Sequence, residues 1–205
     1  MRFKNWTFPY IFTFILINFS MRGYYRRVIR RGAYKLPKRK PIIFALNHQN
    51  SLIDPCIIAG STGVATFFLA TAAVFKNPKI AKILKKINML PIYRERDGAD
   101  FIQKNVAIFE ECNEILSENS RLIIFPEGSH NFRKRLRPLK KGIARIAIGA
   151  NNVAKEDVLI VPVGINYTST FTKNADLFMN FGEPINTAEI IQSIANPKNE
   201  NEVIN

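Results

Sequence analysis

Residues 41–46 read PIIFAL, a continuous apolar run of strand length that is followed directly by polar residues. Two more runs lie downstream, RLIIF at residues 121–125, which is apolar after Arg121, and VLIVPV at residues 158–163. Runs that are apolar at every position are typical of strands covered on both faces, as in a parallel sheet. These three runs therefore predict the buried centre of a sheet.

Helical patterns separate these runs. Helices are expected over residues 53–60, 78–88, 99–117 and 140–154, and further strands over residues 66–70, 89–93 and 178–181. Such alternation predicts an α/β fold with a mostly parallel, helix-flanked sheet, and 205 residues suit a single domain. The helix over 99–117 is expected to turn one apolar side to the core, made of Phe101, Ile102, Val106, Phe109, Cys112 and Leu116.

The charge of the chain is high and uneven. The formal net charge is +14, no acidic residue precedes Asp54, and 11 of the 30 Lys and Arg residues lie in residues 1–40. Such a balance indicates a polyanionic partner, either nucleic acid or an anionic membrane. A hydrophobic content of 47% excludes wholesale disorder, and two cysteines are too few for a disulfide scaffold, so reduced thiols are expected.

The basic N-terminal part begins with an uncharged, aromatic-rich stretch, WTFPYIFTFILINFSM at residues 6–21. As a helix it would span about 24 Å, less than the roughly 30 Å core of a bilayer. Residues 21–31 are expected to continue as an amphipathic helix. Its apolar side would hold Met21, Tyr24, Tyr25, Val28 and Ile29, and its basic side Arg22, Arg26, Arg27, Arg30 and Arg31.

Together these stretches predict a membrane-associating helical segment over residues 1–34, lying on an anionic leaflet at the cytoplasmic face of the inner or plasma membrane. The alternative is a core helix with a solvated basic face. At the other end of the chain, residues 191–205 are expected to form a polar tail.

In a parallel sheet, functional residues gather after the carboxyl ends of strands. Asn47 and His48 follow the first apolar run directly, and Asp54 comes six residues after His48. A histidine with a carboxylate at its second ring nitrogen makes a general base. The same residues also fit a helix start, with Asp54 as N-cap and Pro55 at the first position.

Two other predicted strands end in charged residues. Arg94 follows residues 89–93, where a guanidinium suits phosphate oxygens, although a solvated turn is the alternative. Glu127 and Gly128 follow residues 121–125. A basic run comes next, and a glycine turn beside such a run suits a phosphorylated ligand. Alternatively, Glu127 only partners that run, which comprises Arg133, Lys134, Arg135, Arg137, Lys140, Lys141 and Arg145.

Several common site motifs are missing from the sequence. It contains no G-x-S-x-G, Walker, G-x-G-x-x-G or H-E-x-x-H motif. Two isolated histidines and two distant cysteines do not make a zinc site, so no metal is expected.

Read in order, four segments resemble the sequence blocks of the glycerolipid acyltransferase superfamily. The resemblance covers roughly residues 35–185 and rests on Asn47-His48…Asp54, Pro91-Ile92-Tyr93-Arg94, Phe125-Pro126-Glu127-Gly128 and Val161-Pro162-Val163. Two departures stand out. His48 and Asp54 form a His-x5-Asp variant of the usual His-x4-Asp, a form similar to some glycerol-3-phosphate acyltransferases. The third block continues Ser129-His130 in place of Thr-Arg.

The resemblance implies an acyltransferase domain over residues 35–190. It implies transfer of a fatty acyl group from acyl-CoA or acyl carrier protein to the free hydroxyl of 1-acylglycerol 3-phosphate, giving phosphatidate, with no cofactor. His48 would be the general base and Asp54 would orient its ring. The acceptor and its phosphate would be bound by Asn47, Arg94, Glu127, Gly128, Arg133 and Arg135, or Arg137.

Three alternatives stay open at this point. The acceptor can be glycerol 3-phosphate or another lysolipid. The chain can be a non-catalytic, basic membrane- or nucleic-acid-binding protein in which His48 and Asp54 are structural, although no nucleic-acid-binding signature occurs. An acyltransferase-like hydrolase is disfavoured because no activated Ser or Cys nucleophile is visible.

Overall fold

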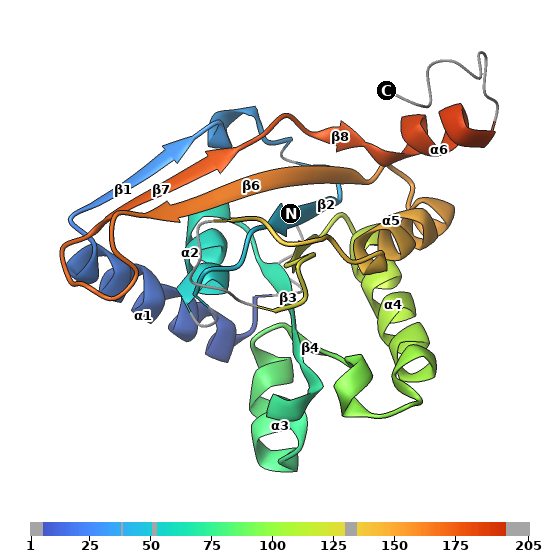
Figure 1. The fold of residues 1–205 in the computed structure, drawn as a ribbon, viewed down its shortest axis with the longest axis horizontal. Coiled ribbons are helices and arrows are strands. Elements are labelled where there is room, and N and C mark those ends of the chain that lie inside the picture. The colour runs from blue at the N-terminus through green and yellow to red at the C-terminus, as the bar shows by residue number, and fades with distance from the viewer. Residues whose placement is uncertain (1–5, 38, 51–52, 130–134, 196–205) are drawn as a thin grey trace.

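The computed structural model describes residues 6–37, 39–50, 53–129 and 135–195 (Figure 1). Eight strands form one sheet in the order β1-β7-β6-β2-β5-β3-β4, and β8 pairs with β6. The strands are β1 (Arg27–Arg31), β2 (Ile42–Leu46), β3 (Thr66–Thr71), β4 (Met89–Ile92), β5 (Arg121–Ile124), β6 (Leu159–Tyr167), β7 (Asp176–Phe181) and β8 (Ile185–Asn186).

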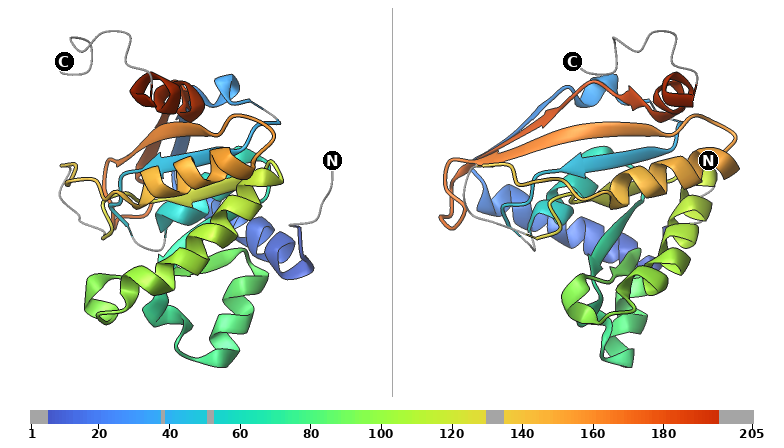
Figure 2. Two further views of the ribbon diagram at one scale, coloured as in Figure 1. Left: turned by 90° about the vertical axis from the view of Figure 1, so that its right-hand side faces the viewer. Right: turned by 45° about the vertical axis from the view of Figure 1, so that its right-hand side comes forward.

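Helices cover both faces of the central strands. They are α1 (Phe8–Tyr24), α2 (Ile53–Thr62), α3 (Pro78–Lys86), α4 (Phe101–Ser117), α5 (Gly142–Val153) and α6 (Thr187–Ala195), with short 3-10 turns η1 (Ala33–Lys35), η2 (Ala72–Phe75) and η3 (Glu95–Asp97). Figures 1 and 2 show α4 and α5 together on one side of β2, with α1 and α2 on the other.

The side chains of β2 divide between two apolar clusters. Ile42, Phe44 and Leu46 pack with α1 and α2, whereas Ile43 packs with α4 and α5. Successive strand residues point to opposite faces, so a strand that is apolar at every position needs a covered face on each side. This is why the continuous apolar runs lie at the centre of the sheet.

The strand directions confirm a single α/β domain with a mostly parallel sheet. The pairs β2–β5, β2–β6, β3–β5, β3–β4 and β1–β7 are parallel, whereas β6–β7 and β6–β8 are antiparallel. The expected strand over 158–163 is longer than predicted, because alternating burial continues to the end of β6 at Tyr167.

The predicted amphipathic helix over residues 21–31 is wrong. Helix α1 ends at Tyr24, and residues 27–31 form β1, which pairs in parallel with β7. A helix would have placed like charges four residues apart at Arg22 and Arg26 and again at Arg26 and Arg30, which is unfavourable. The observed turn also buries Tyr25 against Tyr167, with ring centroids 5.9 Å apart. The described residues before 35, from residue 6 onward, therefore share the sheet and the core of the rest of the chain.

Helix α1 lies along α2 and has one packed and one exposed side. Its N-cap Thr7 accepts a hydrogen bond from the Tyr10 amide, and Tyr10 is buried. Asn18 lies so close to Gly60 that a Cβ there would come within 2.7 Å of the Asn18 amide, which explains a glycine inside α2 rather than at its end. Among the described helices, none is long and apolar enough to cross a bilayer.

Helix α4 agrees with its predicted apolar side only in part. Cys112 and Leu116 are buried as expected, and burial raises the pKa of the Cys112 thiol to about 12. Ile102 and Val106, in contrast, are 54% and 52% exposed. The core side of the first turns holds Asn105, whose side-chain amide bonds both backbone groups of Tyr93 at 2.9 and 2.8 Å. These hydrogen bonds to the chain after β4 therefore turn Asn105, and not Ile102 or Val106, toward the core.

Two further expectations concern the cysteines and the C-terminal residues. Cys56 and Cys112 are not joined by a disulfide in the described part of the chain. Residues 191–195 belong to α6, so the predicted polar tail begins within a helix, and residues 196–205 lie outside the described part of the chain.

Candidate active site

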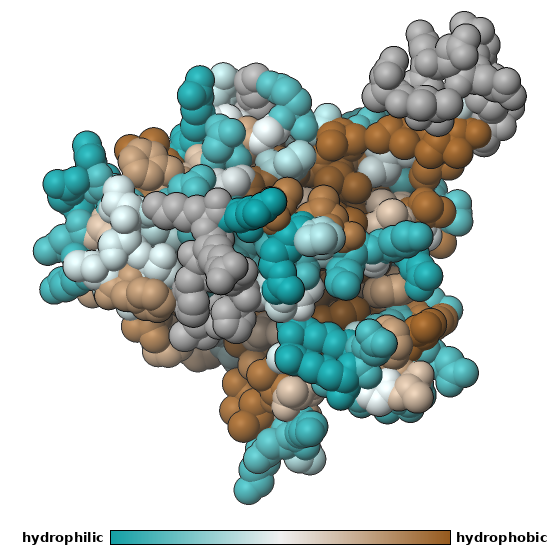
Figure 3. Space-filling model, in the orientation of Figure 1, coloured by the Kyte–Doolittle hydropathy of each residue, from teal (hydrophilic) through white to brown (hydrophobic). Residues whose placement is uncertain are grey.

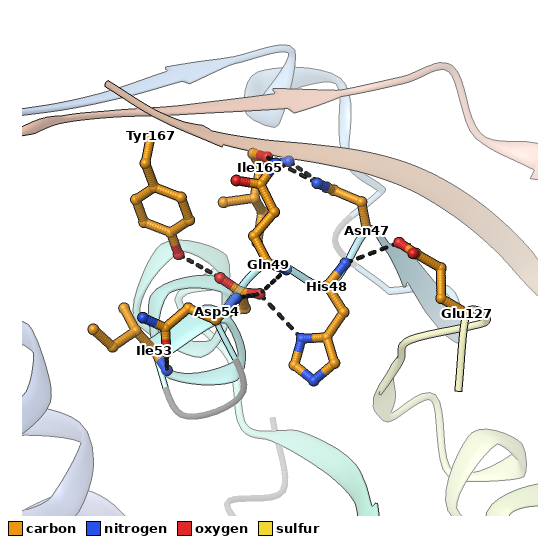
Figure 4. A network of polar contacts seen from close by, with 9 residues as sticks. Asn47, His48, Gln49, Ile53, Asp54, Glu127, Ile165 and Tyr167 are labelled. Carbon is orange, nitrogen blue, oxygen red and sulfur yellow. Dashed lines mark hydrogen bonds and ion pairs between the residues drawn. The ribbon is translucent and has the colours of Figure 1, made fainter. Parts of the chain in front are cut away.

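His48 and Asp54 form a hydrogen-bonded pair beyond the carboxyl end of β2. His48 Nδ1 lies 3.0 Å from Asp54 Oδ2 (Figure 4). Helix α2 begins one residue before Asp54, and the Asp54 amide donates to the Asn50 carbonyl at 3.2 Å. Asp54 is thus not the N-cap of this helix. The Asn50 side chain accepts from the Ile53 amide at 3.2 Å, and the Asp54 carboxylate faces the histidine.

The Asp54 carboxylate is fully buried and accepts four hydrogen bonds. Besides His48, Oδ2 accepts from the backbone amides of Gln49 at 2.9 Å and Asn50 at 2.8 Å, and Oδ1 accepts from the Tyr167 hydroxyl. Four donors around one carboxyl suit its ionised, acceptor-only form. This network assigns the proton between the pair to His48 Nδ1 and leaves the lone pair on Nε2, which lies on the ring edge away from Asp54 in Figure 4.

The His48 ring is also fixed from its face. It stacks on Phe125, with centroids 3.9 Å apart and planes inclined by 23°, and its side chain is 11% exposed. The His48 backbone amide donates to Glu127 Oε1 at 3.0 Å. The other carboxylate oxygen of the buried Glu127 accepts from the Arg137 amide at 3.3 Å, so Glu127 joins the loop after β2 to the loop after β5.

Asn47 and Gln49, on either side of His48, bind to β6. The Asn47 side chain pairs with the backbone of Ile165 in both directions, at 2.6 and 2.9 Å, and Gln49 Nε2 donates to the Ile165 carbonyl at 3.3 Å. These contacts hold the loop against a central strand. A contact from Asn47 to substrate stays a prediction.

Two other predicted site residues, Arg94 and Gly128, follow strands that run parallel to β2. Because β2, β5, β3 and β4 are all parallel, Arg94 after β4 and Gly128 after β5 follow carboxyl ends on the side of His48. Three strand spacings place β4 roughly 14 Å from β2. Burial, and secondly Arg96, lower the pKa of Arg94. Gly128 has φ of +71°, and its amide closes a turn on the Phe125 carbonyl at 3.0 Å.

The predicted basic run is described only in part. Arg133 lies outside the described residues, Arg135 is exposed, and the exposed Arg137 guanidinium donates to the Ser129 hydroxyl. In the described ranges, no group of three or more His, Cys, Asp and Glu side chains is arranged to hold a metal ion.

Tyr167 is the site residue that the sequence pattern missed. It lies four positions beyond the predicted end of its strand, although continued alternation through Gly164-Ile165-Asn166-Tyr167 was the available signal. Burial, and secondly the charge of Asp54, raise its pKa well above the ordinary value, so the hydroxyl keeps its proton and can only donate to the carboxylate.

Replacing Tyr167 with phenylalanine removes one of the four donors to Asp54. The buried carboxylate is then left with three donors, and a hydrogen bond to a charged group contributes about 1.5–3 kcal/mol. We expect the free energy of unfolding of Tyr167→Phe, measured by denaturant titration, to fall by about that amount. Tyr25→Phe, which removes the hydroxyl from the neighbouring ring, is the control and should cost less. An unchanged free energy of unfolding in Tyr167→Phe would show that the hydroxyl does not support the carboxylate.

Comparisons with known proteins give a consistent result. The family model described as Acyltransferase matches residues 27–166. Curated relatives include glycerol-3-phosphate O-acyltransferase 1 of Saccharomyces cerevisiae, 21% identical over 95% of this chain and 37% of that protein. They also include the chloroplastic 1-acyl-sn-glycerol-3-phosphate acyltransferase BAT2 of Brassica napus, 27% identical over 70% and 38%, and 1-acyl-sn-glycerol-3-phosphate acyltransferase alpha of Mus musculus, 26% identical over 76% and 51%.

A solved structure shares the fold. The 1-acyl-sn-glycerophosphate (LPA) acyltransferase PlsC from Thermotoga maritima superimposes with a TM-score of 0.64 at 22% identity, covering 87% of this chain and 69% of that one. The chain spans between 37% and 51% of the length of the curated relatives it matches.

Proposed function

The chain belongs to the acyltransferase family, and on this premise we propose that it transfers a fatty acyl group from a thioester donor to the free hydroxyl of 1-acylglycerol 3-phosphate, giving phosphatidate. The observation that carries the proposal is the His48–Asp54 pair, in which a buried carboxylate oxygen lies 3.0 Å from Nδ1. With the proton on Nδ1, Nε2 is the ring nitrogen that acts as the base. This arrangement suits a base that activates a hydroxyl.

In the proposed reaction, His48 Nε2 takes the proton of the acceptor hydroxyl while that oxygen attacks the thioester carbonyl carbon. The new carbon–oxygen bond forms, and collapse of the tetrahedral intermediate breaks the carbon–sulfur bond. The departing thiolate then recovers the proton from the imidazolium, so His48 returns to its starting state. Asp54 stabilises the imidazolium between the two proton transfers and keeps the ring in one tautomer.

Direct transfer agrees with the state of the two cysteines. Burial, and secondly the charge of Asp54, raise the pKa of Cys56 to about 11, and Cys112 is buried in the core. A covalent acyl-enzyme on cysteine needs a thiolate, and neither thiol has the surroundings that produce one at neutral pH. In the proposed reaction the acyl group therefore passes directly from donor to acceptor, without an acyl-enzyme on cysteine.

The phosphate of the acceptor distinguishes the proposed substrate from neutral lysolipids. Arg94 after β4 and Arg135 and Arg137 after β5 follow strands that run parallel to β2, and in the proposed site their guanidinium groups would bind the phosphate through pairs of its oxygens. The names of the Brassica and mouse relatives favour lysophosphatidate as acceptor. Glycerol 3-phosphate is the second candidate, because the yeast relative is named for it and the His-x5-Asp spacing resembles that group.

An acceptor panel tests the substrate. The purified chain is incubated with labelled acyl-CoA or acylated acyl carrier protein and with lysophosphatidate, glycerol 3-phosphate or lysophosphatidylcholine. We expect labelled phosphatidate to form at least about tenfold faster than any other product. A substrate that lacks a group bound by the site reacts more slowly by that factor or more. Faster acylation of glycerol 3-phosphate would establish the second candidate, and no transfer to any acceptor would refute the proposal.

We further propose that the chain works on the cytoplasmic face of an anionic membrane, held there by α1. The side of α1 away from α2 exposes a row of large apolar residues, namely Phe8, Ile11, Phe12, Ile15, Leu16 and Phe19. Figure 3 shows apolar residues along the lower left edge, where Figure 1 places α1. Such a row, followed by arginines, is typical of a helix that lies in the interface.

Helix α3 extends the proposed contact. It carries no acidic residue, exposes Ile80 and Ile83, and has lysines at positions 79, 82, 85 and 86. The Thr7 hydroxyl before α1 donates to the Lys86 carbonyl at the end of α3 at 2.6 Å, so the two helices meet. Basic residues near an apolar surface add attraction to anionic lipids.

Substituting two phenylalanines of α1 tests the membrane contact. Phe12→Asp with Phe19→Asp removes two exposed aromatic side chains, and we expect co-sedimentation with anionic vesicles to weaken by about tenfold or more, given the free energy of burying such groups. The matched control is Ile148→Asp with Val153→Asp, two exposed apolar residues of α5. An equal loss in both pairs would show that added negative charge, and not the face of α1, causes the effect.

A further inference from the structure

One concave site is lined by none of the residues assigned to acyl transfer. A cavity of about 260 Å³ opens between the end of α1, β1 and α2, and Figure 1 shows α1 and β1 diverging from their turn with α2 beside them. Its apolar lining includes Ile57 and Leu177, and its charged lining is Arg22, Arg26 and Arg30. It shares none of its lining residues with the predicted site residues.

The strand at residues 27–31 creates this arrangement. Successive strand residues point to opposite faces, so Val28 and Arg30 line the cavity together, whereas Ile29 and Arg31 point the other way. The helix predicted from the sequence would have gathered all the arginines on one solvated face. The observed strand instead directs part of the basic segment into a concave surface.

The cavity holds more positive charge than its surroundings neutralise. Asp176 binds Arg26, whose Nε and Nη2 donate at 2.9 and 2.7 Å, and it also binds Arg27. These two arginines hold the pKa of the Asp176 carboxyl well below its usual range. The single negative charge of Asp176 thus faces the two positive charges of Arg26 and Arg27. The positive charges of Arg22 and Arg30 come in addition.

Donors remain available on these two arginines. Arg30 uses its Nε–H for the Ser61 hydroxyl at 3.0 Å, which leaves four of its five N–H groups. Within the described residues, the Arg22 guanidinium takes part in no ion pair. Two guanidiniums with open donors beside an apolar wall suit a planar pair of oxygens on a phosphate or carboxylate, and the apolar wall strengthens the attraction.

The neighbouring surface indicates where such a ligand comes from. Arg22 lies three residues after Phe19 and seven after Ile15, so it continues the exposed apolar face of α1. The cavity volume is just below the roughly 300 Å³ at which pockets for drug-sized ligands begin, so it suits a headgroup and not an acyl chain.

We propose that this cavity binds the phosphate group of a small mono- or diester, as presented by the headgroup of an anionic phospholipid beside α1. The bound headgroup would fix the orientation of the protein on the leaflet, since it ties the end of α1 to β1 and α2. The proposal rests on the proposed membrane association but is independent of the acyl-transfer chemistry, because the two sites use different residues.

The test compares two pairs of substitutions that remove the same charge. Arg22→Gln with Arg30→Gln alters the cavity, and Arg31→Gln with Arg39→Gln removes two exposed arginines outside its lining. Binding is measured on phosphatidylcholine vesicles doped with phosphatidylglycerol or, separately, with phosphatidate. We expect the cavity pair to bind about tenfold more weakly or worse, and the control pair to lose less than about threefold. Equal losses would reduce the cavity to one part of a diffuse basic surface and overturn the proposal.

Further measurements guard against a folding defect and separate the two phosphate sources. Arg22→Gln alone changes one exposed side chain, so it should keep the wild-type Tm and still bind vesicles about threefold more weakly. Inorganic phosphate and glycerol 3-phosphate are then added, and Tm is compared between wild type and the cavity pair. If the cavity pair binds vesicles more weakly but the added phosphates change Tm equally in both proteins, the site is assigned to a lipid headgroup. If the added phosphates raise Tm of wild type more than that of the cavity pair, and vesicle binding is equal, the site is assigned to a soluble phosphate. If neither difference is seen, the site is refuted.

Discussion

His48→Ala is expected to lower the turnover of acyl transfer about 10²- to 10⁴-fold, the range that a general base contributes. The acceptor hydroxyl would then have to lose its proton to water during attack on the thioester. KM for lysophosphatidate should change little, because the imidazole acts in the transition state more than in binding. The measurement is the initial rate of phosphatidate formation at saturating donor.

The fold provides the control for this variant. The side chain of His48 packs on Phe125 at the edge of the sheet and is not part of either apolar cluster. Vesicle binding and the overall fold should therefore stay close to wild type, while the loss of one of the four donors to the buried Asp54 carboxylate should lower the free energy of unfolding by about 1–3 kcal/mol. Turnover within about threefold of wild type would remove His48 from the chemistry and leave the pair as a structural contact.

Asp54→Asn is expected to have the second largest effect, a loss of turnover of about 10²- to 10⁴-fold. Asparagine keeps the shape but removes the charge that stabilises the imidazolium. Its NH2 group would also face a donor, either the backbone amides of Gln49 and Asn50 or the Tyr167 hydroxyl. At least one buried donor then loses its acceptor, so the free energy of unfolding should fall by about 1–3 kcal/mol or more.

The matched control is Asp100→Asn, which removes an exposed carboxylate paired with Lys104 four residues later. Exposed pairs of this kind contribute little, so both turnover and denaturant midpoint should remain near wild type. If Asp54→Asn retained full turnover while losing stability, the carboxylate would serve only to hold the loop after β2.

The centre of the fold could be predicted because its apolar runs can be buried completely in only one kind of arrangement. Strand β2 is apolar at every position and β5 at every position after Arg121, and only a sheet covered on both faces buries them completely. Parallel strands then place the residues after β2 and β5 on one edge, which made His48 and Glu127 visible as site candidates. The pairing of His48 with Asp54 depended on a loop whose shape the residues alone left open.

The remaining features depended on long-range contacts that local patterns do not show. The apolar and the charged side chains of residues 21–31 recur at helical spacing, so they would fall on opposite sides of a helix. Pairing of residues 27–31 with β7 and the burial of Tyr25 favour a strand instead. The contact from Tyr167 to Asp54 joins residues 113 positions apart. Asn105 faces inward because it bonds the backbone of Tyr93, which no apolar periodicity can show.

The predicted substrate-binding residues divide in a similar way. Asn47 and Glu127 were expected at the acceptor, and the structure shows both side chains bound to the backbone around His48. Their residue types fit either role, since amide and carboxylate groups bond backbone and ligand alike. Only the positions of β6 and of the loop after β5 distinguish the two.

The most direct measurement of the central claim is thiol release from the acyl donor with and without lysophosphatidate. It is made with wild type and His48→Ala, using acyl-CoA and acylated carrier protein in turn. If His48 activates the acceptor hydroxyl for direct transfer, wild type releases thiol only when lysophosphatidate is present, in step with the phosphatidate formed, and His48→Ala releases almost none. Thiol release that is independent of the acceptor, or unchanged in His48→Ala, would contradict the account.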